Sequence, residues 1–191
     1  MADHCRTGVK MSHKGKILVA HPNLKGNEFF EKSVIYLYEH DTTGASGLIL
    51  NKVTPYAVTS LVEQKGMEYI GSDLIHKGGP LSPRAISILH TDDWYNSNTI
   101  TINAFGLSSD NFMLEKLSMG NEARNWRMFS GMCGWAPGQL EAEINGTVPY
   151  GKDKGWLIVD ATEDLMFNYD GDDQWVKAVD MCSKSVIQQY F

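Results

Sequence analysis

The chain has 191 residues, with 17 basic and 23 acidic side chains, a formal net charge of −6 and 42% hydrophobic residues. This length suits one domain that buries roughly 70% of its unfolded surface, so a core forms without disulfides or metals. Seven acids and one base lie between Asp160 and Asp180, which accounts for the whole net charge. The absence of a basic surplus argues against direct nucleic-acid binding, because such binding depends on neutralising phosphates.

The sequence shows no segment that would direct the chain to a membrane or out of the cell. No run approaches the 18 or more apolar residues of a membrane span, and the first 16 residues lack the apolar stretch of a signal peptide. The cysteines, Cys5, Cys133 and Cys182, include no Cys-x-x-Cys pair, which argues against a disulfide framework or a zinc ribbon. We therefore expect a cytoplasmic protein with a flexible basic tail over residues 1–14 and a single domain over residues 15–191.

The first part of the chain is predicted to form three strands and a helix. Apolar runs predict strands over residues 16–20 and 47–53, and five consecutive apolar or aromatic residues predict a strand over 33–39 that is covered on both faces. The turn sequence between the last two favours a hairpin. Thr54 followed by Pro55 is typical of a helix start, and this helix is expected to reach Gly66.

The middle of the chain is predicted to form three more strands and a helix. A strand over residues 73–77 is closed by the turn sequence Gly-Gly-Pro, and alternating apolar and polar residues predict strands over 86–90 and 99–104. Ser108 or Ser109 is expected to cap the helix that follows, which Gly120 would end.

The last part of the chain alternates strands and helices irregularly. We expect a strand over residues 125–132, a glycine-rich loop, a short helix carrying Leu140 and Ile144, a strand over 156–159 and a final helix capped by Asp173. The sequence contains no repeat and no linker. These features predict a single-domain α+β fold with a mixed, largely antiparallel sheet, flanking short helices and a C-terminal helix.

The densest motif of the chain is the run Gly-Met-Cys-Gly-Trp-Ala-Pro-Gly-Gln-Leu-Glu-Ala-Glu-Ile from Gly131 to Ile144. Its glycines permit tight turns, and Trp135 is a large anchor for the segment. At this motif the chain resembles the AlgH/YqgE family of small bacterial proteins, whose biochemistry is unassigned. Ordered blocks around residues 20–34, 39–51, 78–90 and 165–178 extend the resemblance over nearly the whole domain. Relative to the family pattern, the segment from Asn145 to Gly155 is interpreted as an insertion.

The blocks that carry the resemblance define a candidate binding surface. It comprises His40, Asn51, Gly78, Gly79, Pro80, His90, Gly134, Trp135, Gly138, Gln139 and Glu141. These residues come from several parts of the chain, so a common site requires that the fold bring them together.

Several patterns could carry chemistry, and none of them matches a known catalytic or metal-binding template. Cys133 lies ahead of a predicted helix start, where a thiol could become reactive, but a small buried residue beneath Trp135 is the favoured interpretation. The histidines have no standard metal-ligand spacing, so structural hydrogen-bonding roles are expected for His40 and His90.

The glycine- and acid-rich segments also depart from the templates they suggest. Residues 44–47 lack the Gly-x-Ser-x-Gly spacing of a nucleophile elbow. The glycines of the motif form neither a dinucleotide-binding fingerprint nor a phosphate-binding P-loop, although a helix start remains a general anion site. Residues 168–173 fail the EF-hand template. We therefore assign no catalytic residue, no metal and no cofactor from the sequence.

Two functions follow as expectations, and direct DNA binding through the basic tail over residues 1–14 is a third hypothesis that the charge balance disfavours. The resemblance implies a regulatory role, since the family carries a transcriptional-regulator label, and the chain has no helix-turn-helix or basic recognition helix. We therefore expect a non-enzymatic regulatory or protein-interaction factor that acts through a protein partner. The alternative is a small-molecule or nucleotide-binding protein, or a cryptic enzyme, that uses the loop from Gly131 to Glu141.

Overall fold

The structure is a computed structural model that describes residues 12–151 and 153–188. Residues 1–11, which make up most of the expected tail, lie outside this part, as does Cys5. Within it, no helix has the length and apolar character needed to cross a bilayer. The strands are β1 (Lys16–Ala20), β2 (Val34–Asp41), β3 (Gly44–Ile49), β4 (Val53–Ala57), β5 (Leu74–Lys77), β6 (Leu81–Thr91), β7 (Ile100–Ile102), β8 (Phe105–Ser108), β9 (Trp126–Trp135) and β10 (Trp156–Asp160).

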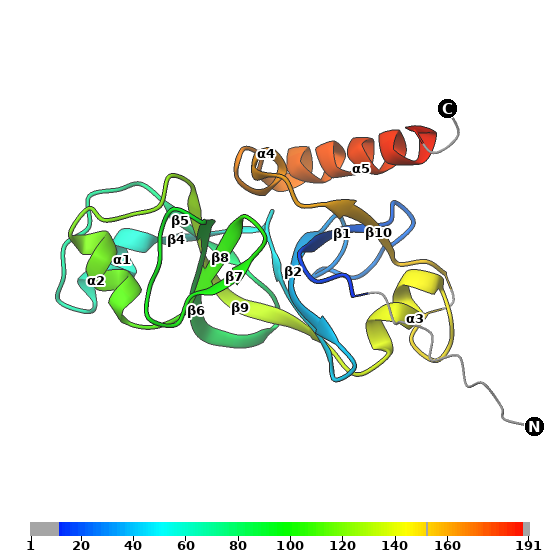
Figure 1. Ribbon diagram of the computed structural model, residues 1–191, viewed down its shortest axis with the longest axis horizontal. Helices are drawn as coiled ribbons and strands as arrows, with labels where there is room; N and C mark the ends of the chain where they lie inside the picture. Colours follow the sequence, from blue (N-terminus) through cyan, green and yellow to red (C-terminus); the bar gives the residue numbers. More distant parts are fainter. Residues whose placement is uncertain (1–11, 152, 189–191) are drawn as a thin grey trace, which may run out of the picture.

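Five helices flank these strands. They are α1 (Val58–Glu63), α2 (Phe112–Ser118), α3 (Gln139–Asn145), α4 (Glu163–Phe167) and α5 (Gly171–Gln188). The α+β prediction is confirmed, because the strands form one curled, largely antiparallel sheet and the long helix α5 closes the chain (Figure 1).

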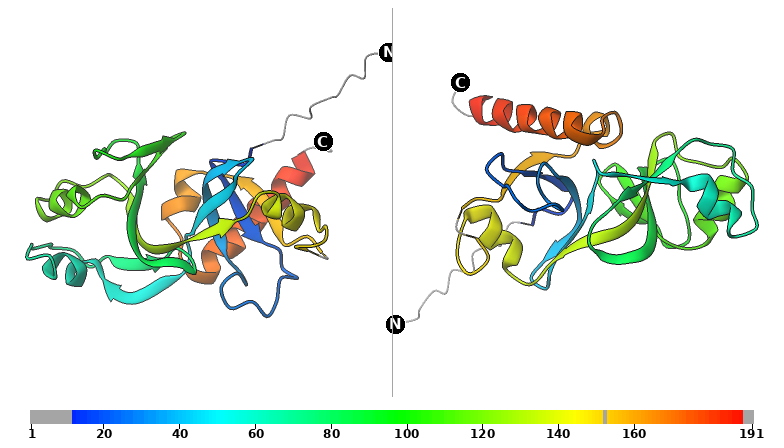
Figure 2. Two further views of the ribbon diagram at one scale, coloured as in Figure 1. Left: turned by 90° about the horizontal axis from the view of Figure 1, so that it is seen from below. Right: turned by 180° about the vertical axis from the view of Figure 1, so that it is seen from behind.

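The sheet runs in the order β10-β1-β2-β3-β9-β6-β8-β7, with β5 beside β9 in the single parallel pairing and β4 beside β5. Strand β9 joins two lobes, since its first part pairs with β6 and its last three residues pair with β3. Helices α3 and α5 lie at one end of the molecule and α1 and α2 at the other, as Figure 1 and the turned views of Figure 2 both show.

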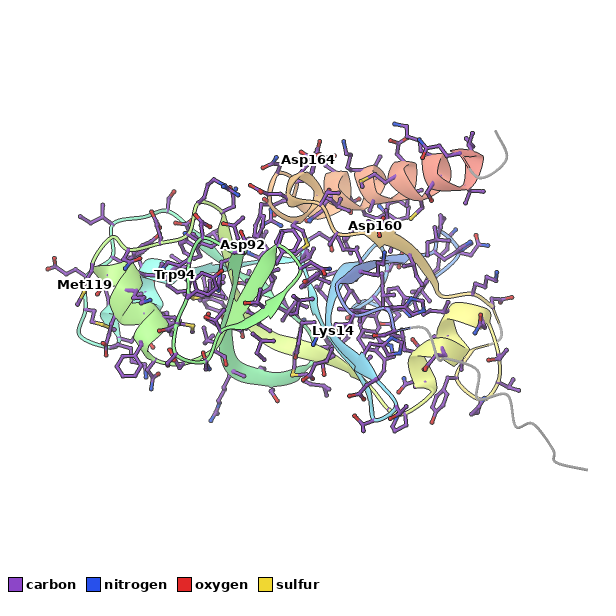
Figure 3. The ribbon with its side chains drawn as sticks, in the orientation of Figure 1. Lys14, Asp92, Trp94, Met119, Asp160 and Asp164 are labelled. Atoms are coloured by element: carbon purple, nitrogen blue, oxygen red, sulfur yellow. The ribbon has the colours of Figure 1, made fainter. Side chains whose placement is uncertain are left out.

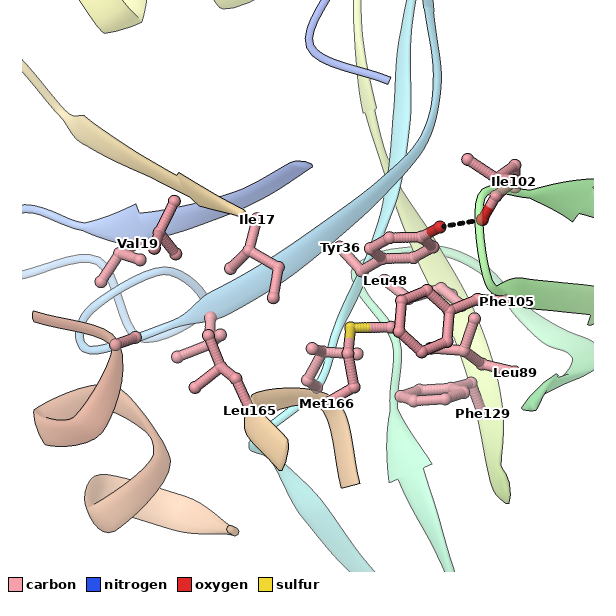
Figure 4. Close-up of a cluster of buried hydrophobic side chains, with 14 of the residues drawn as sticks. Ile17, Val19, Tyr36, Leu48, Leu89, Ile102, Phe105, Phe129, Leu165 and Met166 are labelled. Carbon is pink, nitrogen blue, oxygen red and sulfur yellow. Dashed lines mark hydrogen bonds between the residues drawn. The ribbon is translucent and has the colours of Figure 1, made fainter. Parts of the chain in front are cut away.

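Strand β2 is buried on both faces, as its continuous apolar run predicts. Val34 and Tyr36 belong to a cluster that includes Leu165 and Met166 of α4, and Figure 4 shows Tyr36 and Met166 in the same group of side chains. The Tyr36 hydroxyl also donates a hydrogen bond of 3.3 Å to the carbonyl of Ile102. The alternate residues of β2 face a second cluster beside α3.

The other lobe has its own apolar cluster. Val58 and Val62 of α1 pack with the buried face of α2 and with Ile88 and Met128 of the sheet. Trp94 belongs to this cluster, and Figure 3 places it with Met119 at the end that carries α1 and α2.

Most acids of the stretch near the C-terminus form ion pairs, four of them with bases from other segments and two with nearby lysines. Lys16 pairs with Asp160, Lys32 with Asp172 at 2.5 Å, and Arg124 with Glu163 at 2.9 Å. Asp164, Asp170 and Asp180 also have basic partners. Six of the seven acids are thus ion-paired. The negative charge of this stretch is therefore less available to a basic partner than the sequence alone indicates.

Four local predictions are wrong. Asp173 does not cap the final helix, because it is the third residue of α5, which begins at Gly171. The other three fail because of contacts between distant segments. Pro55 lies in β4 and the helix begins three residues later, since the Thr54 hydroxyl donates to the carbonyl of Ile75 at 2.6 Å. Ser108 ends the unpredicted strand β8, where its hydroxyl contacts His90, and α2 begins only at Phe112. The first half of the predicted glycine-rich loop is strand, because β9 continues to Trp135 through its pairing with β3.

Candidate functional site

The motif segment forms the end of β9, a three-residue turn and the start of α3. Gly138 precedes the helix with a φ of 77°, a left-handed conformation that favours glycine. The side-chain oxygen of Gln139 accepts a hydrogen bond of 3.0 Å from the backbone N–H of Ala136. This contact fixes the turn and sets the first residue of α3 against the end of the strand.

Glu143 is the centre of the site. Its Oε2 atom accepts hydrogen bonds from the indole Nε1 atoms of Trp135, at 2.9 Å, and Trp156, at 2.8 Å. Its Oε1 atom accepts from Nε2 of Gln139 at 2.9 Å. The two indole rings meet edge to face, with centroids 6.3 Å apart. One carboxylate thereby fixes β9, α3 and β10 relative to one another.

A pocket of about 850 Å³ opens over this group. The aromatic and apolar side chains that line it are Leu24, Phe30, Trp135, Tyr150 and Trp156. The polar side chains are His21, Asn23, Lys25, Asn27, Gln139, Glu143, Asp153 and Lys154. Both indoles are almost fully buried and form its floor, and the Phe30 ring packs edge to face on Trp156 at 5.7 Å.

The pocket carries charges of both signs. Glu143 and Asp153 supply carboxylates, whereas Lys25 and Lys154 supply ammonium groups. Among the ion pairs within residues 12–151 and 153–188, none involves these four side chains. Their charges are therefore available to a bound molecule.

The two residues that organise the pocket floor were not among the predicted site residues. Glu143 follows Gln139 by four positions and shares a helix face with it, which is a signal that the sequence does contain. Trp156 lies beyond the interpreted insertion, and only the pairing of β10 with β1 brings it to Trp135. The segment between α3 and β10 supplies Tyr150 and further parts of the wall.

Of the predicted surface, Gly134, Trp135 and Gln139 line the pocket. Glu141 instead faces His40, whose Nε2 atom lies 3.5 Å from its Oε1 atom. Nδ1 of His40 accepts a hydrogen bond of 2.8 Å from the backbone N–H of His13, and the two imidazole rings stack with centroids 5.4 Å apart.

Two other predicted residues have structural partners away from the pocket. Asn51 accepts from the backbone N–H of Val34 at 3.0 Å and donates to the carbonyls of Lys32 and Gly171. His90 is fully buried. Its Nδ1 atom contacts the Thr91 carbonyl at 2.8 Å and its Nε2 atom contacts the hydroxyl of Ser108 at 3.0 Å.

The glycine pair before β6 serves close backbone packing. A Cβ atom on Gly78 would lie 2.3 Å from the carbonyl oxygen of Gly131, and one on Gly79 would lie 2.2 Å from a backbone atom of Met132. Pro80 follows on the exposed side. The two glycines therefore allow the segment between β5 and β6 to lie close against β9, and none of the three residues lines the pocket.

The remaining candidates are a possible nucleophile, an acidic loop and a metal site, and none of them has the geometry that its chemistry requires. Cys133 is 1% exposed, and burial raises the pKa of its thiol to about 12. Asp170, in the predicted acidic loop, pairs with Arg127 at 3.1 Å and with His76 at 3.2 Å. No group of three or more His, Cys, Asp or Glu side chains is placed to hold a metal ion within the residues that the structure describes.

The fold and the pocket define a single α+β domain with an aromatic-floored cavity at one end of a curled sheet. A family model described as AlgH-like matches residues 17–186, so the chain belongs to the AlgH-like family. It is 34% identical to a UPF0301 protein of Shewanella frigidimarina over 87% of this chain and 89% of that one. A UPF0301 protein of Marinomonas sp. is also 34% identical, over 87% of each chain.

Two solved structures share the fold. The solution structure of AlgH from Pseudomonas aeruginosa matches with a TM-score of 0.74 and 24% identity, over 95% of this chain and 92% of that one. A crystal structure of a Corynebacterium diphtheriae protein matches with a TM-score of 0.68 and 23% identity, over 88% and 86% of the two chains. At these identities the likeness concerns the fold, and the function has to be argued from the site.

Proposed function

We propose that this protein is a non-enzymatic binding protein that holds a small ligand in the pocket above Glu143. The observation that carries the proposal is the floor of the pocket, where one carboxylate holds Trp135, Trp156 and Gln139 in place. A volume of about 850 Å³ falls within the range of ligand pockets. Such a preformed floor lowers the entropic cost of binding, because few side chains must become ordered.

Binding is favoured over catalysis because the nucleophile candidates, Ser108 and Cys133, are buried and do not line the pocket. Ser108 and His90 are in contact, but both are fully buried in the other lobe. Burial suppresses the thiolate form of Cys133. The carboxylate of Glu143 has a structural role, because its three hydrogen bonds hold Trp135, Trp156 and Gln139 in place.

The experiment is a ligand screen read at the tryptophan side chains. Indole N–H resonances of Trp135 and Trp156 report on the pocket, whereas Trp94 in the other lobe is an internal reference. We expect a bound metabolite to raise the melting temperature and to shift the first two resonances selectively. A broad screen without such a shift, or one in which Trp94 responds equally, would contradict the proposal.

A second candidate function is regulation through a protein partner, and the lobe carrying α1 and α2 favours it. Several of its large apolar or aromatic side chains are exposed, among them Ile70 at 100%, Met119 at 79%, Tyr56 and Phe112. Exposed apolar groups of this kind are common at protein interfaces. A pull-down with the I70E/M119E variant should lose a partner that the wild type retains, while a variant in the ligand pocket should keep it.

A further inference from the structure

We propose that the ligand of the pocket is a short peptide with free termini, bound with its ammonium group at Glu143 and its carboxylate at Lys25 and Lys154. This assignment rests on the proposed binding function and adds the chemical class of the ligand. It follows from the charges that the pocket leaves unpaired, from the half-buried position of Glu143 against the exposed Lys25 and Lys154, and from the size of the cavity.

The floor of the pocket favours a cationic nitrogen. Glu143 is stabilised by three neutral donors and has no ion-pair partner in the described part of the chain. Each carboxylate oxygen can accept about two hydrogen bonds. Oε2 has both from indoles, whereas Oε1 has one and retains capacity for another. A protonated amine at this oxygen would neutralise a partly buried charge beside aromatic rings, which also attract cations.

The rim of the pocket favours an anion. Lys25 and Lys154 are exposed and approach the pocket from two different segments. His21 lines the same cavity. A purely anionic ligand such as a nucleotide would meet these bases but would be repelled by the carboxylates of Glu143 and Asp153. A ligand with one charge of each sign satisfies both sets.

The volume and the remaining polar groups favour a peptide over a free amino acid. About 850 Å³ is at the upper end of the usual range for small-ligand pockets, so it accommodates several residues. The side-chain amides of Asn23 and Asn27 lie in the wall, where they offer donors and acceptors that match peptide groups. Leu24 and Phe30 also line the pocket and provide apolar surface for the peptide's side chains.

The test compares three probes that differ only at their ends: tri-alanine, N-acetyl-tri-alanine and tri-alanine amide. We expect tri-alanine to shift the indole resonances of Trp135 and Trp156, and N-acetylation to weaken binding at least tenfold. In E143Q, acetylation should change the dissociation constant less than threefold, because the charge that recognises the ammonium group is gone. Amidation should weaken binding to the wild type. It should not change binding to the K25A/K154A variant, because the bases that recognise the carboxylate are gone.

The controls separate recognition from folding. E39Q makes the same change at an exposed position on β2 and should behave as wild type. Lys25 and Lys154 are exposed, so the K25A/K154A variant should have the melting temperature of the wild type. A loss of carboxylate recognition in this variant is then not caused by unfolding. Equal effects of acetylation in the wild type and E143Q would overturn the peptide assignment.

Two further probes, AMP and glutarate, separate the peptide assignment from the general ligand-binding function on which it rests. If AMP or glutarate shifts Trp135 and Trp156 at concentrations where tri-alanine does not, the peptide class is overturned and the binding function stands. If neither these probes nor the broad screen shifts the two resonances, both proposals fail.

Discussion

The guanidinium group of Arg127 lies 3.1 Å from the carboxylate of Asp170, and this pair ties β9 to the segment between α4 and α5. Arg127 is almost completely buried, and it also donates to the backbone carbonyls of Leu50, Phe167 and Tyr169. One side chain thus joins the central strand to the C-terminal helices that cover the sheet.

Replacing Arg127 with Met should destabilise the protein by about 3 kcal/mol, since hydrogen bonds to a charged group are lost and buried carbonyls are left without donors. Urea unfolding measures this change. R127K keeps the charge but cannot reach several carbonyls at once, so it should fall between R127M and the wild type. An R127M protein within about 0.5 kcal/mol of the wild type would show that α4 and α5 are held by apolar packing alone.

Removal of the Glu143 carboxylate should cost stability as well as binding. In E143A both indole N–H groups lose their acceptor, and each unsatisfied buried donor costs about 1–3 kcal/mol. In E143Q the amide oxygen can still accept from Trp135 and Trp156, so the loss should be smaller. Urea unfolding followed by tryptophan fluorescence measures both variants. Equal stabilities of E143A and E143Q would contradict the hydrogen-bonding role.

Substitution of Gly106 by Ala should destabilise the lobe that carries α1 and α2. A Cβ atom at this position would lie 2.2 Å from Cε1 of His90, whose ring is fully buried and cannot move away. Overpacking of this kind costs about 1–3 kcal/mol. Gly155→Ala is the matched control, because its nearest atom would be the Glu143 carbonyl oxygen at 3.7 Å. The difference in melting temperature between the two variants gives the cost of the clash.

Stability should fall as the pH is lowered from about 7 to 5. Burial lowers the pKa of His90, burial and Arg127 lower the pKa of His76, and burial and His40 lower the pKa of His13. Because these pKa values are lower in the folded state, the unfolded chain binds more protons as the pH drops through this window. Melting temperatures between pH 8 and pH 5 measure the effect.

The variant H90Q tests whether buried histidines cause the pH dependence, because it removes one buried titrating group. It should flatten the dependence of melting temperature on pH, whatever it does to stability at pH 8. The exposed change E39Q should leave the slope as in the wild type. A slope that H90Q does not alter would mean that the pH dependence has another source.

The buried thiols should be unreactive in the native protein. Burial raises the pKa of Cys133 to about 12 and that of Cys182 to about 11, and the thiolate is the reactive form. In a C5S variant, which removes the cysteine outside the described residues, a thiol reagent at pH 8 should label only slowly. Labelling should become complete in denaturant. Rapid labelling of the native variant would contradict the burial of both side chains.

The local parts of the fold were predictable because they depend on neighbouring residues. The continuous apolar run of β2 predicts a strand covered on both faces, and the turn after Asp41 predicts the hairpin with β3. The Asp41 carboxylate accepts a hydrogen bond from the Thr43 backbone N–H at 2.7 Å. Such short-range contacts form within a few residues, so the pattern alone indicates them.

The course of β9 was not predictable in this way. Its glycine-rich end has the composition of a loop, but pairing with β3 and β6 extends it as a strand to Trp135. The backbones of Gly78 and Gly131 approach so closely that no side chain fits between them. Strand pairing between distant segments decides this element, and such pairing overrides local preference.

The sequence by itself determined the α+β class, the family, the short helix that carries Leu140 and Ile144, and the acidic stretch before the C-terminus. Only the tertiary structure decided that Trp156 joins Trp135 at one carboxylate, and that Lys16 and Lys32 neutralise part of that stretch. The physical reason is the distance along the chain over which each interaction acts. Helix spacing and turn chemistry act between neighbours, whereas a pocket and its charges are formed by segments that only the paired sheet brings together.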